Sequence, residues 1–182
     1  MRLSQTDLET FQAQHPDHRL ELVSGKVIVM SPSGYESDEV AAEAIRLLGN
    51  WVRPRRLGRV AASSAGFRLP NVNHDVRAPD ASFVLAERLR HSPQSFAELA
   101  PDLMIEVKSP TDSLEALEAK ISDFLSLGTQ VGLLIDPETQ TVAVYRVGQP
   151  ALTLGNEDRL TVPDVLPGWE VSVADLWPLV FE

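Results

Sequence analysis

The chain has 182 residues, of which 43% are hydrophobic and 23% charged, as in ordinary soluble globular proteins, and its length favours one domain over residues 1–182. It contains no cysteine, which excludes disulfides, thiolate zinc sites and cysteine nucleophiles. No run of about 18 apolar residues predicts a membrane span, and the polar N-terminus lacks a signal-peptide core, so we expect a cytoplasmic protein with no membrane partner.

The net charge of −10 is concentrated in the second half of the chain. Residues 1–91 hold 12 Lys and Arg against 11 Asp and Glu, whereas residues 92–182 hold 4 against 15. This distribution disfavours a broad basic surface for nucleic acid. A local basic patch is still compatible with it, and so is an acidic site whose charge is offset by bound metal.

The first elements along the chain are a short helix and a hairpin. Residues 4–13 suit a helix that begins at Ser4 or Thr6, both of which are good N-cap residues. Two short apolar strands, 20–23 and 27–30, flank a Ser-Gly turn and predict a β-hairpin.

A long helix and two strands follow the hairpin. Apolar residues recur at helical spacing over 37–52, and we expect Pro54 to end this helix. The pattern then predicts a strand over 59–69, a loop over 70–79 and a short strand over 81–85.

The second half contains a strand, a helix and a hairpin. Residues 103–107 are a strongly apolar strand, and 109–128 form the clearest helix of the sequence, with Asp112 as its expected N-cap. A hairpin over 131–147 and short strands with a helical turn over 158–180 complete the chain. The order helix, three strands, helix, strand predicts a mixed α/β sheet flanked by helices.

Two near-copies of one motif precede strands: "RAPDASFVL" and "LAPDLMIEV". We interpret Asp102, in the second copy, as a turn residue. Asp80, in the first, begins a strand that can lie beside the strand of Glu106. Since side chains alternate along a strand, Glu106 and Lys108 project from one face, which we expect to turn toward Asp80.

This set of residues suits metal-assisted hydrolysis of a phosphodiester. Mg²⁺ prefers oxygen ligands and often takes only one or two carboxylates, with water and phosphate completing its shell. A lysine beside the metal can orient the attacking water and offset phosphate charge. Glu-x-Lys pairs also occur on many solvated sheet faces, and this alternative stays open from the spacing alone.

The order and spacing of these motifs resemble the PD-(D/E)XK nuclease superfamily, and more specifically its Uma-type restriction endonuclease family. The resemblance runs from about residue 19 to 177 and includes "RLELVSGKVIVMSP", "RAPDASFVL", "APDLMIEVKSPTD", "KISDF", "LLIDPE" and "LPGWEVSVADLW". It implies a restriction-endonuclease-like αβββαβ core preceded by the N-terminal hairpin. It also implies a Mg²⁺-dependent endonuclease that cuts DNA, with Mn²⁺ as a substitute metal.

The resemblance also implies roles for individual residues. Asp80 and Glu106 correspond to the metal-binding carboxylates, with the Val107 carbonyl as a third ligand. Lys108 corresponds to the catalytic lysine, and Glu21 to an additional acidic ligand of metal or water.

Two further positions matter to the resemblance. Lys120 matches a lysine of the following helix that is expected to face the site and to take part in catalysis. Family members often carry a histidine shortly after the "MSP" segment, and Ser37 or a neighbour stands there instead.

Other interpretations of these residues stay open. Glu21 could be an exposed strand residue paired with Lys26 across the hairpin, and Lys120 an exposed helix residue paired with nearby glutamates. The dense basic run of Arg53, Arg55, Arg56 and Arg59 could contact phosphates or could be a solvated helix end.

No serine-hydrolase elbow, P-loop or dinucleotide-binding glycine motif is present. The resemblance, together with the set of Asp80, Glu106 and Lys108, makes a metal-dependent endodeoxyribonuclease the leading interpretation, and a homodimer is a candidate assembly because two strands must be cut. The alternatives are an inactive interaction module that keeps the fold and a metal-dependent hydrolase of RNA or a small phosphodiester.

Overall fold

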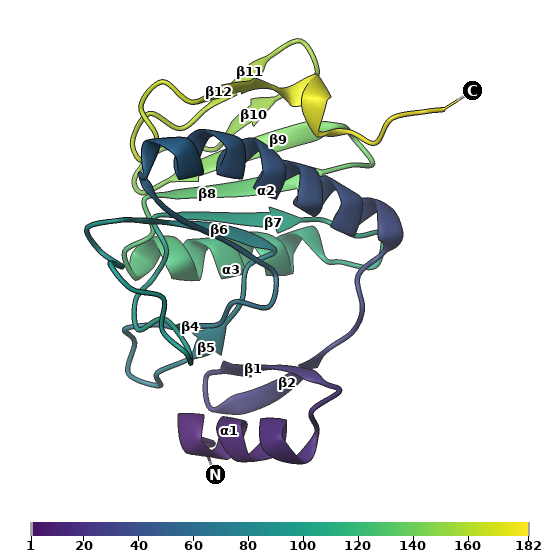
Figure 1. Ribbon diagram of the computed structural model, residues 1–182. Coiled ribbons are helices and arrows are strands. Elements are labelled where there is room, and N and C mark those ends of the chain that lie inside the picture. The colour runs from purple at the N-terminus through teal and green to yellow at the C-terminus, as the bar shows by residue number, and fades with distance from the viewer. Residues whose placement is uncertain (1, 182) are drawn as a thin grey trace.

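The computed structural model describes residues 2–181, and a six-stranded mixed sheet lies at its centre (Figure 1). Its strands are β3 (Gly58–Ala62), β6 (Ala81–Leu85), β7 (Leu103–Val107), β8 (Val131–Asp136), β9 (Thr141–Arg146) and β10 (Leu152–Leu154). They lie in the order β10-β9-β8-β7-β6-β3. Only β7 and β8 pair in parallel, and the other neighbours in this sheet are antiparallel.

Two helices cover opposite faces of this sheet, α2 (Tyr35–Arg55) and α3 (Leu114–Ser126). Helix α3 is the crossover between the parallel strands β7 and β8, as parallel pairing requires. The order α2-β3-β6-β7-α3-β8 is the predicted αβββαβ core, so the predicted fold class is confirmed.

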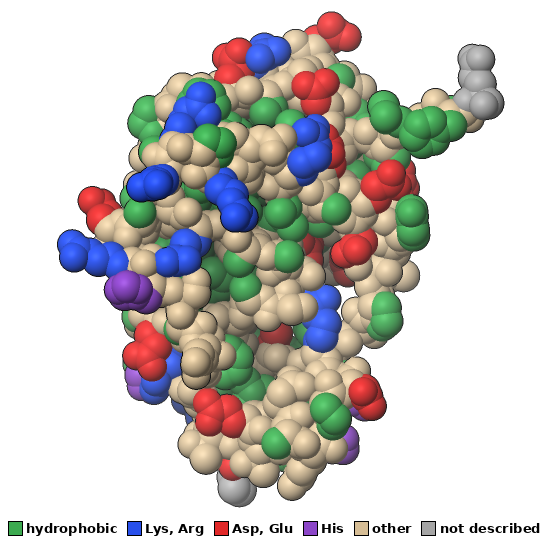
Figure 2. Space-filling model, viewed as in Figure 1, with side chains coloured by type: hydrophobic (Ala, Val, Ile, Leu, Met, Phe, Trp, Pro, Cys, Tyr) green, Lys and Arg blue, Asp and Glu red, His purple; other side chains and the backbone are tan. Residues whose placement is uncertain are grey.

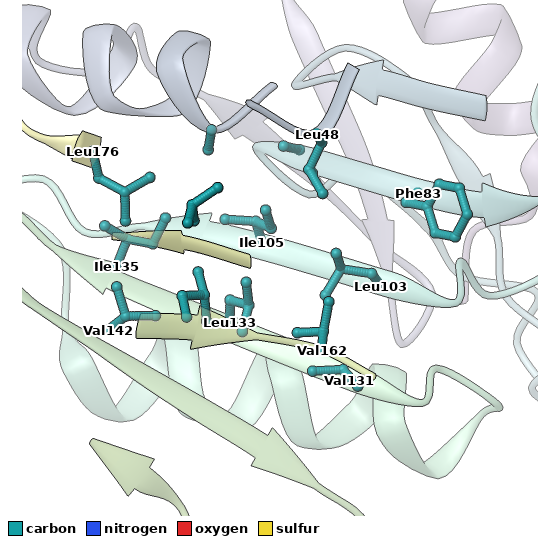
Figure 3. Packing of buried hydrophobic residues seen from close by; sticks show 14 of the residues in the cluster. Leu48, Phe83, Leu103, Ile105, Val131, Leu133, Ile135, Val142, Val162 and Leu176 are labelled. Atoms are coloured by element: carbon teal, nitrogen blue, oxygen red, sulfur yellow. The ribbon is translucent and has the colours of Figure 1, made fainter. Parts of the chain in front are cut away.

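The face of the sheet toward α2 holds the larger core. Leu103, Ile105 and Val107 of β7 project into it and pack with Leu48 and other apolar residues of α2. Figure 3 shows Leu48, Leu103 and Ile105 in this core. The C-terminal part of the chain extends this layer through β11 (Arg159–Thr161), β12 (Glu170–Ser172) and a 3₁₀ helix, Val173–Leu176.

The opposite face packs against α3. Met104 of β7 contacts a cluster that includes Ile121 and Phe124, so Glu106, two residues further on, projects toward α3 as well. Gly132 of β8 lies directly under Ile121, where a Cβ atom would come within 2.4 Å of the isoleucine side chain. The missing side chain therefore allows α3 to lie close to the sheet beside Glu106.

A second, four-stranded sheet lies beside the first and carries the N-terminal hairpin (Figure 1). Its order is β2-β1-β5-β4, and helix α1 packs on it through Leu8. The bounds are α1 (Gln5–Gln14), β1 (Arg19–Val23), β2 (Lys26–Met30), β4 (Phe67–Arg68) and β5 (Val76–Arg77). The predicted helix and hairpin are thus confirmed, with Ser4 as N-cap.

Three local predictions were wrong. The single strand expected over 59–69 is broken by a turn after β3, and its second part, β4, joins the other sheet. The expected loop over 70–79 contains β5. Pro54 does not end α2, because it lies in the last turn, where few further helical bonds are lost; the helix ends after Arg55, with Arg56 in the left-handed region.

The expected cap of α3 was also wrong. Ser113 is the N-cap, and its side chain accepts a hydrogen bond from the Ala116 amide. Asp112 instead accepts hydrogen bonds from the amide and hydroxyl of Ser109, at 2.8 Å each, and so fixes the loop between β7 and α3. Within residues 2–181, no helix is both long and apolar enough to cross a membrane.

Candidate active site

A cavity of about 430 Å³ lies where the two sheets meet, at the end of β7 and the start of β6. Five of the residues singled out from the sequence line it: Glu21, Asp80, Glu106, Val107 and Lys120. Glu21 lies on β1, Asp80 directly before β6, Glu106 and Val107 on β7, and Lys120 on α3. A larger cavity of about 660 Å³ lies along the edge of β3, but no carboxylate lines it.

Asp80 lies across the antiparallel strand pair from Glu106. It directly precedes Ala81, which is paired with Ile105, so the next position along the register is Glu106. Its Oδ2 accepts a hydrogen bond of 2.8 Å from the Val107 amide. Burial raises the pKa of Asp80, although this hydrogen bond and the nearby Lys120 act against the shift.

Glu106 is 3% exposed and forms an ion pair with Lys120. The Lys120 ammonium lies 2.9 Å from Oε1 and 3.0 Å from Oε2, but it is directed as a hydrogen-bond donor only at Oε2. Oε1 is therefore a buried carboxylate oxygen without a hydrogen bond. Burial raises the pKa of Glu106 to about 7, opposed by Lys120 and reinforced by Asp80 and Glu21.

Lys120 is buried, and its ammonium contacts oxygens from three parts of the chain. Besides Glu106, its ammonium donates to the Ala78 carbonyl at 3.0 Å and lies 3.6 Å from Oε1 of Glu21. Burial acts to lower the pKa of Lys120, but the two glutamates outweigh it and the pKa is raised. The alternative of an exposed helix residue is therefore wrong, and a permanent cation lies among the carboxylates.

Glu21 is buried as well and reaches the site from the smaller sheet. It accepts a hydrogen bond of 2.9 Å from the Ala78 amide, and its Oε2 lies 3.5 Å from Nε of Arg77. Lys26 is paired with Val23 rather than with Glu21, so the alternative of an exposed cross-hairpin ion pair is wrong.

Lys108 does not join this group. Strand β7 ends at Val107, and the Lys108 ammonium lies 3.0 Å from Glu138 and 3.8 Å from Asp136, on the side of β8. The hydrogen bond to Glu138 is the main reason why the pKa of Lys108 is raised. Its side chain does not line the cavity, and its predicted catalytic role stays a prediction.

Asp102, at the other end of β7, has a structural role. It is fully buried and accepts hydrogen bonds from the Leu85 amide at 2.9 Å, Arg88 at 2.6 Å and Gln130 at 2.9 Å. It does not line the cavity, so the structure places it apart from Asp80 and Glu106. Its carboxylate holds β6, β7 and the loop after β6 together.

Two other sequence features lie away from the cavity. Ser37, where a histidine was expected, donates to the Gly34 carbonyl at 2.9 Å within the first turn of α2. The basic run lies at the opposite end of the sheet: Gly58 pairs with Leu85 at the end of β6, whereas Asp80 precedes β6 (Figures 1 and 2). Arg59 donates to the Leu89 and Arg90 carbonyls, and so fixes a loop.

Three charged residues of the cavity were not predicted to belong to the site: Arg19, Arg77 and Asp112. Arg77 stands three residues before Asp80 and pairs with Asp123 at 3.0 Å as well as with Glu21. In the sequence, Arg77 stands in the short polar stretch before Asp80, and we interpreted this stretch as a loop. Asp112 was interpreted as a helix cap, which concealed its position at the cavity.

The chemistry of the donor set fits a hard divalent cation. Glu106 Oε1 is buried without a hydrogen bond, and Asp80 lies beside it on the neighbouring strand. Among residues 2–181, however, no three His, Asp or Glu side chains already form a metal-ligand cluster. Such a cation would therefore take two carboxylates and complete its shell with backbone and water oxygens, as Mg²⁺ commonly does.

Comparison with known proteins identifies the family of the chain. The model of the Uma2 family, described as "Putative restriction endonuclease", matches residues 6–174. The chain belongs to the Uma2 family. The resemblance found in the sequence is therefore confirmed, and the fold is that of this nuclease family.

A solved structure shares the fold of this Uma2 member. It is the crystal structure of "a putative nuclease belonging to DUF820" from Anabaena variabilis, with 28% sequence identity and a TM-score of 0.75. The match covers 86% of this chain and 88% of that chain. No curated protein matches the chain.

Proposed function

We propose that this protein is a Mg²⁺-dependent endonuclease that hydrolyses DNA phosphodiester bonds, with Mn²⁺ able to replace Mg²⁺. One observation carries the proposal: Asp80 and Glu106 lie side by side at a cavity, and the buried Glu106 carboxylate is paired with the Lys120 ammonium but has no hydrogen bond to Oε1. Membership of a family described as restriction endonucleases supports a nuclease. The requirement for a metal and the choice of DNA as substrate go beyond family membership and belong to the proposal.

Asp80 and Glu106 are the proposed metal-binding carboxylates, with the Val107 carbonyl as a further oxygen ligand. When bound, Mg²⁺ would supply Lewis-acid stabilisation of the phosphate and a more acidic bound water. The Val107 amide holds Asp80 through its hydrogen bond, so the end of β7 fixes both carboxylates relative to each other. Glu21 completes the acidic group from the smaller sheet.

Lys120 is the ammonium that we propose to act in catalysis. It lies inside the cavity, whereas Lys108 pairs with Glu138 outside it. An ammonium can stabilise negative charge that develops on a phosphate oxygen, and we propose this role for Lys120. Glu21, 3.6 Å away, would keep it oriented.

The mouth of the cavity offers a contact for the DNA backbone. Arg19 lines the cavity and is exposed, and a guanidinium suits a phosphate because its donors match two phosphate oxygens. With a net charge of −10, we expect DNA binding to be weak without divalent metal and to decrease steeply with salt.

Plasmid cleavage tests the proposal. Supercoiled plasmid is incubated with Mg²⁺ or Mn²⁺ and with the wild-type protein or one of three variants, Glu106→Gln, Lys120→Met and Lys108→Met. We expect Glu106→Gln and Lys120→Met to lose cleavage and Lys108→Met to retain it. Cleavage by Glu106→Gln at the wild-type rate would overturn the proposed site, and loss of cleavage in Lys108→Met alone would return the catalytic role to Lys108.

A non-catalytic interaction module is the second candidate, and one observation favours it. Lys120 pairs with both Glu106 and Glu21, so part of the negative charge of the site is already compensated without metal. Calorimetric titration with Mn²⁺ separates the two functions, because the module would show no binding at millimolar metal. Hydrolysis of RNA and of a small phosphodiester, measured beside cleavage of plasmid DNA, would test the remaining alternative substrates.

A further inference from the structure

Strand β2 is an open edge of the four-stranded sheet. It pairs only with β1, from Lys26 opposite Val23 to Met30 opposite Arg19. Because the hairpin turn has two residues, Lys26, Ile28 and Met30 exchange main-chain hydrogen bonds with β1. The amides and carbonyls of Val27 and Val29 then point outward, and within residues 2–181 they form no other hydrogen bond.

This edge is also apolar. Ile28, Val29 and Met30 are 43%, 59% and 36% exposed, and Lys26 is the only charged residue of the strand. Proteins usually protect such an edge with charges, proline, a bulge or a covering segment, because it can pair with another strand. None of these devices lies along residues 27–30. The other long edge, β3, is less exposed, and β10 has only three residues.

We propose that β2 is the interface of a homodimer, in which β2 of a second copy adds antiparallel to this edge. A two-fold axis beside Ile28 places Ile28 opposite its own copy, Val27 opposite the partner copy of Val29, and Lys26 opposite the partner copy of Met30. The free groups of Val27 and Val29 then form four main-chain hydrogen bonds across the seam. Such a contact is self-complementary and closed, so it ends at a dimer.

Charge supports this register. Lys26 of each copy would lie beside Met30 of the other, and Met30 borders a surface cavity lined by Asp17, Asp38 and Glu39. Arg19 lines the same cavity, which leaves an excess of acidic groups there. The single cation of β2 would therefore meet an acidic surface, whereas a parallel arrangement would place the two Lys26 side chains together.

The seam would also border both candidate active sites. Ile28 is paired with Glu21 and Met30 with Arg19, and paired residues project from the same face of the sheet. Ile28 and Met30 accordingly line the cavity that holds Glu21. A two-fold axis through β2 would place two such cavities on the same side of one continuous sheet. This interface does not depend on the reaction proposed above.

Directed cross-linking tests the register, because the native chain has no cysteine. In the proposed dimer, residue 28 and its copy form a non-hydrogen-bonded pair, whose Cα atoms lie about 4.5 Å apart and within disulfide reach. We expect Ile28→Cys to form a covalent dimer under mild oxidation. Val72→Cys, at a position 94% exposed in a loop, is the matched control and should stay monomeric. Equal cross-linking of the two variants would overturn the proposal.

The mass in solution gives a second test. We expect the wild type to sediment with twice the chain mass of 20.0 kDa, Val29→Lys with the single chain mass, and the control Val72→Lys like the wild type. Thermal unfolding confirms that Val29→Lys is folded. A wild type that stays monomeric overturns the proposal, and so does a Val29→Lys variant that keeps its mass but loses DNA binding, since β2 would then contact the substrate.

Discussion

The two Ala-Pro-Asp segments occupy equivalent places at opposite ends of one strand pair. Asp80 precedes β6 and accepts a hydrogen bond from Val107, the last residue of β7, while Asp102 precedes β7 and accepts one from Leu85, the last residue of β6. Each carboxylate therefore ties the start of its own strand to the end of its neighbour. The antiparallel pairing of β6 and β7 generates this reciprocal arrangement from the repeated motif.

The two carboxylates differ in what else surrounds them. Asp102 has two further donors, Arg88 and Gln130, and lies in no cavity that we describe. Asp80 has one backbone donor, faces Glu106 and has a raised pKa. A buried carboxylate with all its oxygens engaged stabilises the fold, whereas one left partly free beside another carboxylate is available for binding. The number of donors separates the two roles, and the local sequence does not.

The largest effect on function is expected from Asp80→Asn. Asn keeps an acceptor for the Val107 amide but lacks the charge needed for a metal, so cleavage should fall on the order of 10³- to 10⁴-fold. Because the folded protein raises the pKa of Asp80, its charged form is disfavoured by folding, and stability above pH 5 should not decrease. Plasmid cleavage measures the loss of activity, and urea unfolding measures the stability. A variant that unfolds at lower urea than the wild type would show that Asp80, like Asp102, stabilises the fold.

Asp102→Asn should show the opposite pattern. The substitution removes the charge that pairs with the one-third exposed Arg88 and puts an amide donor where Asp102 has an acceptor oxygen, so that donors lose their partner at a cost of about 3 kcal/mol. We expect this loss in the free energy of unfolding from urea denaturation. Cleavage at a temperature where the variant is folded should stay close to that of the wild type. A stable but inactive Asp102→Asn would show that this end of β7 also serves the reaction.

The pH dependence of stability tests the charge at the Asp80 end. The folded state raises the pKa of Glu106 from 4.5 to about 7, so between these values it binds more protons than the unfolded state does. Stability without metal should therefore fall by about 3 kcal/mol as pH rises through this window, and then level off. Glu106→Gln should remove most of this slope. Urea unfolding at pH 5 and pH 8 measures both proteins, and equal slopes would contradict the assignment.

The smallest effect is expected from Lys108→Met. Lys108 pairs with the exposed Glu138 outside the cavity, and surface pairs of this kind contribute little to stability. We therefore expect Lys108→Met to leave both the free energy of unfolding and the initial rate of plasmid cleavage close to those of the wild type. A large loss of activity without loss of stability would show that Lys108 turns into the cavity when substrate binds.

The sequence was sufficient for the parts of the site that depend on strand geometry. Asp80 and Glu106 meet because they are neighbours on adjacent strands, and the side-chain alternation of β7 could be read from its apolar residues. The direction of Lys108 could not be predicted. It follows the last residue of β7, where alternation no longer fixes a flexible side chain and two acidic residues near the end of β8 attract it.

Contacts between distant segments were harder to predict from the residues alone. Glu21 and Lys120 came from the family resemblance, because nothing in their local sequence shows that a hairpin and a helix nearly 100 residues apart share a cavity. Arg77 was missed because its strand has only two residues and lies within an apparent loop. The strand likewise ends after Ala62 because the next strand, β4, pairs within the other sheet, and the local sequence does not show this pairing.

The position of the cavity between two sheets has a consequence for the newly made chain. The six-stranded sheet brings Asp80 and Glu106 together, but Glu21 arrives only when the N-terminal hairpin docks, and the short connection through Arg77 and Ala78 joins the two sheets at this point. A chain in which either sheet is still unfolded therefore lacks a complete acidic group. Any activity that needs all three carboxylates can therefore begin only after both sheets have folded and docked against each other.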